Sequence, residues 1–116
     1  MTTVWTNGCF DVIHRGHIEL FKYAKSLGHY LIVGIDSDEK IKQDKGPTRP
    51  VNCLEDREFV LESIKYIDKV VKFNTGQELN DLIKEIKPDI MVIGSDWKGR
   101  EVVGKEYAKE LVFFDR

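Results

Sequence analysis

A glycine-bearing segment near the N-terminus leads into two histidines whose types and spacing suit phosphate chemistry. The run reads Thr6-Asn7-Gly8-Cys9-Phe10-Asp11-Val12-Ile13-His14-Arg15-Gly16-His17. Imidazoles three residues apart near a helix start share one face, so His14 and His17 can both donate hydrogen bonds to one phosphate chain. Gly8 and Gly16 leave the backbone uncrowded, which lets a phosphate approach the main chain. The run therefore predicts a site for a nucleoside triphosphate.

This motif lies between an expected strand and an expected helix. A short apolar stretch around Val4 and Trp5 precedes it, and Gly28 ends the helical pattern that follows. The residues at helical spacing are Ile18, Leu20, Phe21, Ala24 and Leu27. The first amides of a helix lack partners within it and carry partial positive charge, which attracts phosphate oxygens. We therefore expect the phosphates at this junction.

Further apolar runs rich in β-branched residues alternate with helical segments. Strands are expected at 30–35, 69–73, 90–93 and 111–114. One helix is indicated by Val60, Leu61, Ile64 and Ile67, a second by Leu79, Leu82, Ile83 and Ile86 before Pro88, and a weaker one over 101–109. The alternation predicts an α/β fold: a Rossmann-like doubly wound parallel sheet of about five strands with helices on both faces.

Polar residues follow two of the expected strands at one edge of the sheet, where ligands of such folds bind. They are Asp36, Ser37 and Asp38 after the second strand, and Gly94, Ser95 and Asp96 after the fourth. The segment 41–52 contains Lys45-Gly46-Pro47 and Arg49-Pro50, and this content is too proline-rich and charged for a regular element. We expect it to form a mobile flap near the site.

Composition limits the remaining functions. The 116 residues are 41% hydrophobic and 33% charged, which suits one domain, 1–116, with a single core. A net charge of −2 gives no basic excess, so nucleic acid is not an expected partner. No apolar stretch approaches the roughly 20 residues that span a bilayer, and no signal peptide is recognisable, so we expect a cytoplasmic protein without membrane contact. Cys9 and Cys53 are expected to be free thiols.

A resemblance to a known family adds to this interpretation. Phe10, Asp11 and the tetrapeptide His14-Arg15-Gly16-His17 resemble the HxGH signature of the cytidylyltransferase-like nucleotidyltransferases. Within that superfamily the chain looks most like the adenylyltransferase domain of ADP-heptose synthase, on Thr6-Asn7-Gly8-Cys9-Phe10-Asp11, Lys45-Gly46, Arg49-Pro50-Val51-Asn52 and Arg57. The resemblance covers nearly the whole chain. It implies transfer of a nucleoside monophosphate, most closely from ATP to heptose 1-phosphate for surface carbohydrate synthesis, by a protein that can form homodimers.

The reaction implied by the resemblance needs no protein nucleophile, because the acceptor phosphate is itself an anion that attacks the α-phosphate while pyrophosphate leaves. The protein must position the reactants and neutralise charge. The resemblance implies Mg²⁺ as cofactor, with no expected protein-built metal site, and His14, His17 and Lys45 as catalytic residues. The implied nucleotide-binding residues are Gly8, Cys9, Phe10, Asp11, Gly16, Arg57, Gly94, Asp96 and Arg116.

Several of these residues also have plainer interpretations. Asp11 either orients a histidine or the metal, or it caps its own loop. Lys45 either contacts phosphates or is a solvated surface charge, and Asp96 either lies near the nucleotide or is a turn residue. Arg57 stands at an expected helix start, where a cation opposes the helix dipole, and this placement favours a phosphate role. Cys9 is expected to pack rather than to react.

A zinc site on Cys9, His14 and His17 matches no common four-ligand spacing.

Two departures from the resemblance leave alternatives open. Trp97-Lys98-Gly99 replaces the Gly-Gly-Asp-Tyr wording of the heptose enzymes and resembles glycerol-3-phosphate cytidylyltransferase, so CTP with glycerol 3-phosphate is an alternative pair of substrates. The sequence ends at Asp115-Arg116, before the Ser-Thr-Thr segment of the family, so a non-catalytic nucleotide-binding protein is a further alternative.

Overall fold

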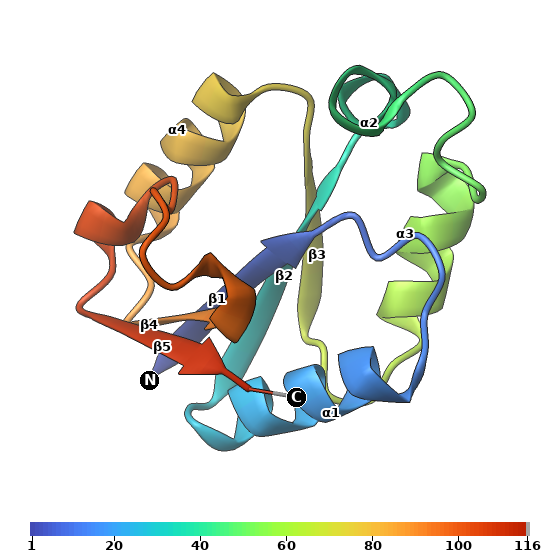
Figure 1. The fold of residues 1–116 in the computed structure, drawn as a ribbon. Helices are drawn as coiled ribbons and strands as arrows, with labels where there is room; N and C mark the ends of the chain where they lie inside the picture. Colours follow the sequence, from blue (N-terminus) through green and yellow to red (C-terminus); the bar gives the residue numbers. More distant parts are fainter. Residues whose placement is uncertain (116) are drawn as a thin grey trace.

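A parallel sheet of five strands forms the centre of the computed structural model, which describes residues 1–115 (Figure 1). The strands are β1 (Thr3–Gly8), β2 (Tyr30–Asp36), β3 (Lys69–Phe73), β4 (Ile90–Gly94) and β5 (Glu110–Phe114). They lie in the order β3-β2-β1-β4-β5, so the strand order reverses at β1. Connections leave β1 in opposite directions at that point, which opens a crevice at the carboxyl ends of the strands. The predicted Rossmann-like sheet is confirmed.

Four α-helices and two short 3-10 turns connect the strands. They are α1 (Arg15–Ser26), α2 (Asp38–Lys45), α3 (Leu54–Glu62), α4 (Gly76–Ile86), η1 (Ser95–Trp97) and η2 (Lys105–Tyr107). Successive strand residues point to opposite faces, which separates the core into two layers. Val4 packs with Phe21 of α1 and Leu61 of α3 in one layer. Trp5 packs with Ile83 of α4 in the other, so helices cover both faces.

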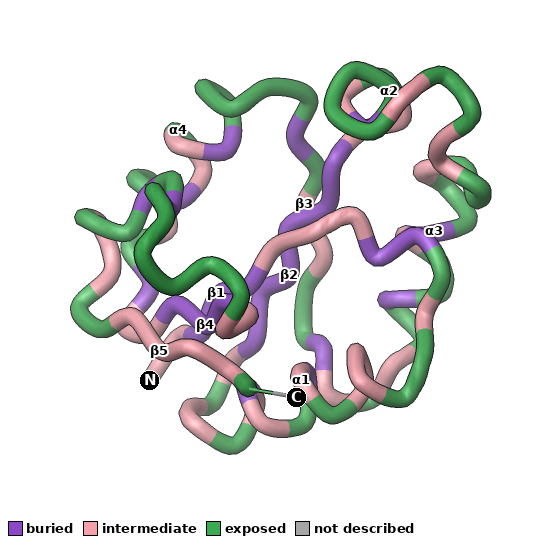
Figure 2. Tube along the Cα trace, in the orientation of Figure 1, coloured by how far each residue is buried: buried purple, intermediate pink, exposed green. Residues whose placement is uncertain are grey.

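The buried residues concentrate along the central strands (Figure 2). Trp5 is fully buried because its indole ring lies directly over Gly34 of the neighbouring strand β2. A Cβ atom added at Gly34 would lie 2.6 Å from that ring, closer than any real contact. The packing of Trp5 on Gly34 fixes how β1 lies against β2, and thereby fixes the position of the residues at the end of β1.

The segment 41–52 is not irregular throughout, which corrects the expected flap. Helix α2 covers its first part, because Ser37 Oγ accepts a hydrogen bond from Lys40 N and caps the helix start. Ile41 is the one buried residue of α2, so the segment has no apolar periodicity by which a sequence pattern could reveal it. The irregular part of the connection is limited to residues 46–53.

Two other helices differ from the expected ones. Helix α3 ends at Glu62, and Ile64 and Ile67 pack against the core from the turns that follow. The region 101–109 contains only the turn η2, because Gly104 has a left-handed backbone, φ +83°, and packs tightly against Ile83. Helix α4 ends as expected, at a left-handed Lys87 before Pro88. Within residues 1–115, no helix has the length and apolar character needed to cross a membrane.

Candidate functional site

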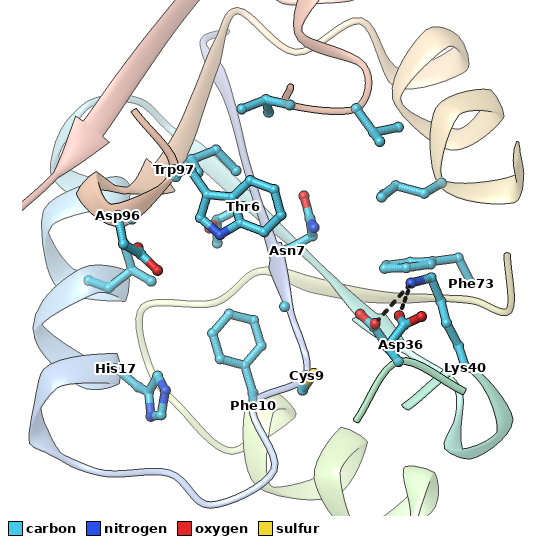
Figure 3. A pocket seen from close by; sticks show the side chains of 18 of the residues that line it. Thr6, Asn7, Cys9, Phe10, His17, Asp36, Lys40, Phe73, Asp96 and Trp97 are labelled. Carbon is cyan, nitrogen blue, oxygen red and sulfur yellow. Dashed lines mark hydrogen bonds and ion pairs between the residues drawn. The ribbon is translucent and has the colours of Figure 1, made fainter. Parts of the chain in front are cut away.

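A cavity of about 630 Å³ lies at the carboxyl ends of the strands (Figure 3). Every strand contributes to its wall through a residue at its end: Gly8, Asp36, Phe73, Gly94 and Phe114. The cavity therefore occupies the crevice that the strand order creates. This is the rim at which the sequence predicted a ligand site.

The structure brings most of the predicted site residues to this cavity. Those that line it are Gly8, Cys9, Phe10, Gly16, His17, Lys45, Gly94 and Asp96. Asp11 and Arg57 instead line a smaller cavity of about 260 Å³, which shares Phe10 with the larger one. His14 contacts His17 at the start of α1, and Arg116 lies outside the described residues.

The two histidines cap helix α1 reciprocally. His14 Nδ1 accepts a hydrogen bond of 3.0 Å from Gly16 N, and His17 Nδ1 accepts one of 3.2 Å from His14 N. Their ring centroids lie 4.0 Å apart. The arrangement is a capping box in which imidazoles replace the usual hydroxyl and carboxylate. Both side chains are therefore held by backbone amides before any ligand binds.

This capping sets the chemistry of the two rings. A nitrogen that accepts an amide hydrogen bond carries no proton, so each neutral imidazole bears its proton on Nε2. His17, which lines the cavity, thus has a donor and not an acceptor as its second ring nitrogen. The amide of Gly16 donates to His14, so it is already engaged at the helix start where the sequence predicted amides for a phosphate.

Phe10 holds this histidine pair against the core. Its ring contacts Phe21 and His17 edge to face, with centroid distances of 5.1 Å and 5.5 Å. Its backbone is left-handed, φ +48°, a conformation that costs a non-glycine residue about 1–3 kcal/mol. Gly8 packs closely beside it, because a Cβ there would lie 3.1 Å from the Phe10 ring. The strained turn positions the loop that joins β1 to α1.

Asp11 caps a loop. Among residues 1–115, none of its hydrogen bonds described below goes to a histidine. Its carboxylate accepts hydrogen bonds from Val51 N (2.7 Å) and Asn52 N (2.8 Å), and it pairs with Arg49. Burial by itself would raise the pKa of Asp11, but these hydrogen bonds and the Arg49 guanidinium hold the pKa below its usual value. Of its two predicted roles, the geometry favours the loop cap.

Arg57 is buried, with 1% of its surface exposed, and ties four segments together. Its guanidinium donates to the carbonyl oxygens of Asn52, Cys9 and Asp36 and to the carboxylate of Asp38. These partners occupy most of its N–H groups. The predicted phosphate role is therefore not supported by its placement, because the charge at the helix start is balanced by Asp38 and by carbonyl groups.

Charged residues of α2 line the cavity beside the end of β1. Lys45 lies in the last turn of the helix, close to Cys9, and Lys40 lies one turn earlier. Burial, followed by the negative charge of Asp36, raises the pKa of the Cys9 thiol, while Lys45 acts in the opposite direction. A raised pKa keeps this thiol protonated at neutral pH, which agrees with the expectation that Cys9 packs rather than reacts.

Asp36 and Lys40 were not among the predicted site residues. The polar run after the second strand pointed to Asp36, but the segment containing Lys40 carried no such signal because α2 was not expected. Trp97 is a further cavity residue that was not assigned to the site; it is 43% exposed in η1 beside Asp96. Its signal was an aromatic residue directly after a strand end.

Asp96 approaches the end of β4 closely. A Cβ at Gly94 would lie 2.7 Å from its Oδ1 atom, so a larger residue there would require the Asp96 carboxylate to move. Asp96 and Trp97 together give this end of the cavity a carboxylate and an exposed aromatic face. Within residues 1–115, no group of three or more His, Cys, Asp or Glu side chains is arranged to hold a metal ion.

Known sequences similar to this chain agree with one another: one family model matches it, and the relatives reported below share one name. The sequence model of the family described as cytidylyltransferase-like matches residues 5–109. The bifunctional protein HldE of Helicobacter hepaticus is 49% identical over 112 residues, and that of Campylobacter fetus is 46% identical over 114. These alignments cover 97% and 98% of this chain but only 23% and 25% of the relatives. The chain therefore spans about a quarter of the length of the curated relatives it matches.

Solved structures give the same fold. The lipopolysaccharide core biosynthesis protein from Thermoplasma volcanium has a TM-score of 0.74 at 25% identity, with 100% of this chain and 95% of that chain covered. A protein of unknown function from Archaeoglobus fulgidus has a TM-score of 0.72 at 21% identity, with coverages of 99% and 90%. The second likeness supports the fold alone.

Proposed function

Because the chain belongs to the cytidylyltransferase-like family, we propose that it transfers a nucleoside monophosphate from a nucleoside triphosphate to a sugar phosphate and releases pyrophosphate. ATP and heptose 1-phosphate are the first choice of substrates. The motif resemblance to ADP-heptose synthase and the similarity to bifunctional HldE support this pairing. The observation that carries the proposal is the reciprocal histidine cap at a cavity formed by all five strand ends.

In the proposed reaction, an oxygen of the acceptor phosphate attacks the α-phosphorus of the nucleotide. A new P–O bond forms, the bond to the β-phosphate bridging oxygen breaks, and pyrophosphate leaves with that electron pair. Negative charge grows on the oxygens around the α-phosphorus. Donors held in place before the reaction stabilise that charge without reorganisation, which is the main contribution a protein can make to such a step.

His17, His14 and Lys45 supply these donors in the proposal. The backbone amides that occupy both Nδ1 atoms leave Nε2–H as the donating group of each neutral ring. Lys45 adds a positive charge from the end of α2. The positive end of the α1 dipole favours the same phosphate oxygens.

Asp96 and Trp97 form the nucleoside end of the proposed site. An exposed indole offers a face on which a base can stack, and a carboxylate accepts hydrogen bonds from ribose hydroxyls. This assignment places the phosphates between the nucleoside end and α2, over the end of β1.

Mg²⁺ is the proposed cofactor, and the cavity could hold it through one carboxylate together with the phosphates of the substrate. Proteins usually hold Mg²⁺ through one or two carboxylates together with substrate phosphates. Asp96 is a cavity carboxylate of that kind, and no all-protein cluster is formed by the described residues. When bound, the ion would neutralise charge on the triphosphate.

CTP with glycerol 3-phosphate is the second candidate pair. It is favoured by Trp97-Lys98-Gly99, which resembles the glycerol-3-phosphate cytidylyltransferases, and Trp97 lies in the wall of the cavity. Nucleotide binding without catalysis is a third candidate, and measurable turnover would rule it out.

The proposal also includes a homodimer. Sedimentation of the protein alone measures this oligomeric state.

The deciding experiment is pyrophosphate release with Mg²⁺ from ATP and from CTP, each offered with heptose 1-phosphate or glycerol 3-phosphate. His17→Ala serves as the blank. Release in one pairing, absent from the blank, identifies both base and acceptor. Nucleotide binding by calorimetry without release in any pairing would contradict the proposed transfer and select the binding protein.

A further inference from the structure

The cavity has two chemically different ends. At the β4 end stand Asp96 and the exposed indole of Trp97, while the β2–β3 end carries Asp36, Lys40 and Phe73. Figure 3 shows the two groups on opposite sides of the end of β1. A nucleobase stacks on an exposed aromatic face, which Trp97 offers at the β4 end, whereas Phe73 at the other end is buried. The β2–β3 end is therefore available for the other reactant.

A charge pair dominates the β2–β3 end. Lys40 Nζ lies 3.5 Å from Asp36 Oδ2 and 2.6 Å from Asp44 Oδ2, so the ammonium is held between two carboxylates at i−4 and i+4. Asp36 is buried, with 8% of its surface exposed, whereas Asp44 lies at the surface. The shorter contact goes to the exposed partner, so Lys40 is anchored by Asp44 and only loosely paired with Asp36.

The pair offers a matched donor and acceptor inside the cavity. An ammonium has three N–H donors, and a carboxylate has about four lone-pair sites, so neither group is saturated by their single contact. A hydroxyl group can accept from Lys40 and donate to Asp36 at the same time. A phosphate is disfavoured beside Asp36, because the two negative charges would repel each other in a partly buried site.

Apolar side chains form the floor beneath the pair. Phe73 is buried with its ring centroid 6.0 Å from Lys40 Nζ, and Leu79 of α4 lines the cavity beside it. A polar pair above an apolar floor matches a molecule that carries hydroxyl groups on one edge and C–H groups on its face. A polyhydroxylated ring or chain has this character.

We propose that Asp36 and Lys40 bind the hydroxyl groups of a polyhydroxylated phosphate monoester, and that they determine which acceptors the protein uses. This inference rests on the proposed function, since the acceptor phosphate must reach the histidines and Lys45. The hydroxyl-bearing part then extends toward α2 and β3. Neither residue contacts the reacting phosphates in this arrangement; both select and position the acceptor.

The test compares acceptors with and without hydroxyl groups. Heptose 1-phosphate is the substrate, and cyclohexyl phosphate, a ring monoester without hydroxyls, is the competitor. A hydrogen bond to a charged group changes affinity by about tenfold to a hundredfold. We expect Asp36→Asn to raise KM for heptose 1-phosphate by about tenfold or more, with the Ki of cyclohexyl phosphate and KM of the nucleotide changed by less than about twofold.

Two further variants make the test specific. Lys40→Met keeps the aliphatic stem but removes the donor, and it should raise the same KM. Glu39→Gln is the matched control, because it removes one carboxylate from the exposed side of α2 without touching the cavity, and it should leave every constant unchanged. Equal effects of Asp36→Asn on heptose 1-phosphate and cyclohexyl phosphate, or no effect on either, would overturn the inference.

A failure of the proposed function would look different. If the wild-type protein releases no pyrophosphate, calorimetric titration with heptose 1-phosphate and with cyclohexyl phosphate in the presence of nucleotide replaces the kinetic constants. If Asp36→Asn weakens the binding of heptose 1-phosphate but not that of cyclohexyl phosphate, the subsite is still supported. Unchanged binding, or no binding by the wild type, would overturn it.

Discussion

At the scale of single residues, the histidines of the motif cap a helix, and in the proposed reaction they are also hydrogen-bond donors. His14 and His17 each use Nδ1 to cap the start of α1, so Nε2–H is the nitrogen to which the proposal assigns the phosphate contact. The two roles are separable by substitution, because a short amide side chain can cap a helix but cannot replace an imidazole in position or reach. His14 is the better probe, since it is the N-cap residue itself.

We therefore expect His14→Ala and His14→Asn to differ in stability but not in activity. His14→Ala should lower the free energy of unfolding by about 0.5–2 kcal/mol through loss of the cap. His14→Asn should keep the cap and most of the stability. Both should lower pyrophosphate release by about a hundredfold or more through loss of a charge-stabilising donor. Urea unfolding and steady-state rates measure the two effects, and an active His14→Asn protein would contradict the catalytic role.

At the scale of elements, Asp11 joins the β1–α1 loop to the connection between α2 and α3. Its two carboxylate oxygens accept amides of Val51 and Asn52, and the Asn52 side chain donates back to the Asp11 carbonyl at 2.6 Å. Arg57 ties the same connection to the ends of β1 and β2. These contacts fix the connection between α2 and α3 against the ends of β1 and β2.

This loop attachment predicts a pH dependence. The pKa of Asp11 is lower in the folded protein than in the unfolded chain, so its stabilising effect is complete above about pH 4 and is lost as the pH falls through the folded-state value. We expect Asp11→Asn to be less stable than wild type at pH 7 and to lose less stability between pH 5 and about pH 2. Denaturant titrations at each pH measure this slope.

Asp68 provides the control for that experiment. Although burial opposes the change, the Lys25 ammonium and the amide of Leu31 lower its pKa, and it lies at the opposite edge of the sheet from the cavity. Asp68→Asn should flatten the acid slope in the same way without affecting nucleotide binding. Equal acid slopes for wild type and Asp11→Asn would contradict the assigned role of Asp11.

At the scale of the whole molecule, the cavity takes residues from all five strand ends, so it exists only when the whole sheet is folded. A ligand that binds only the folded state stabilises the protein against global unfolding. At a nucleotide concentration of 100 times Kd the gain is about 2.7 kcal/mol. For a domain of roughly 100 residues, this corresponds to a rise in Tm of about 10 °C or more.

We expect ATP with Mg²⁺ to produce such a shift in wild type, and a much smaller one in His17→Ala at the same concentration. Phe59→Ser serves as the control, because Phe59 is 72% exposed on α3 and does not line the cavity, so its shift should equal that of wild type. Differential scanning calorimetry gives the values. An equal shift in His17→Ala would show that the nucleotide binds without this histidine.

The sequence by itself determined the parts of this protein that depend on local patterns. Short apolar runs revealed the five strands, helical spacing revealed α1, α4 and part of α3, and the alternation of these elements predicted the doubly wound sheet. The HxGH run, at a strand-helix junction, predicted both the position and the chemistry of the site. Helix α2 escaped detection because only Ile41 is buried in it.

Only the tertiary structure decided which polar side chains face the cavity. Arg57 and Asp11 were expected at the site, but their charges are balanced by carbonyl and amide groups from distant segments. Asp36 ends β2 on the rim that the sequence indicated, whereas Lys40 became a cavity residue only because helix α2 forms and brings it there. Residue type sets what a side chain can donate or accept, whereas its partners come from parts of the chain that only folding brings together.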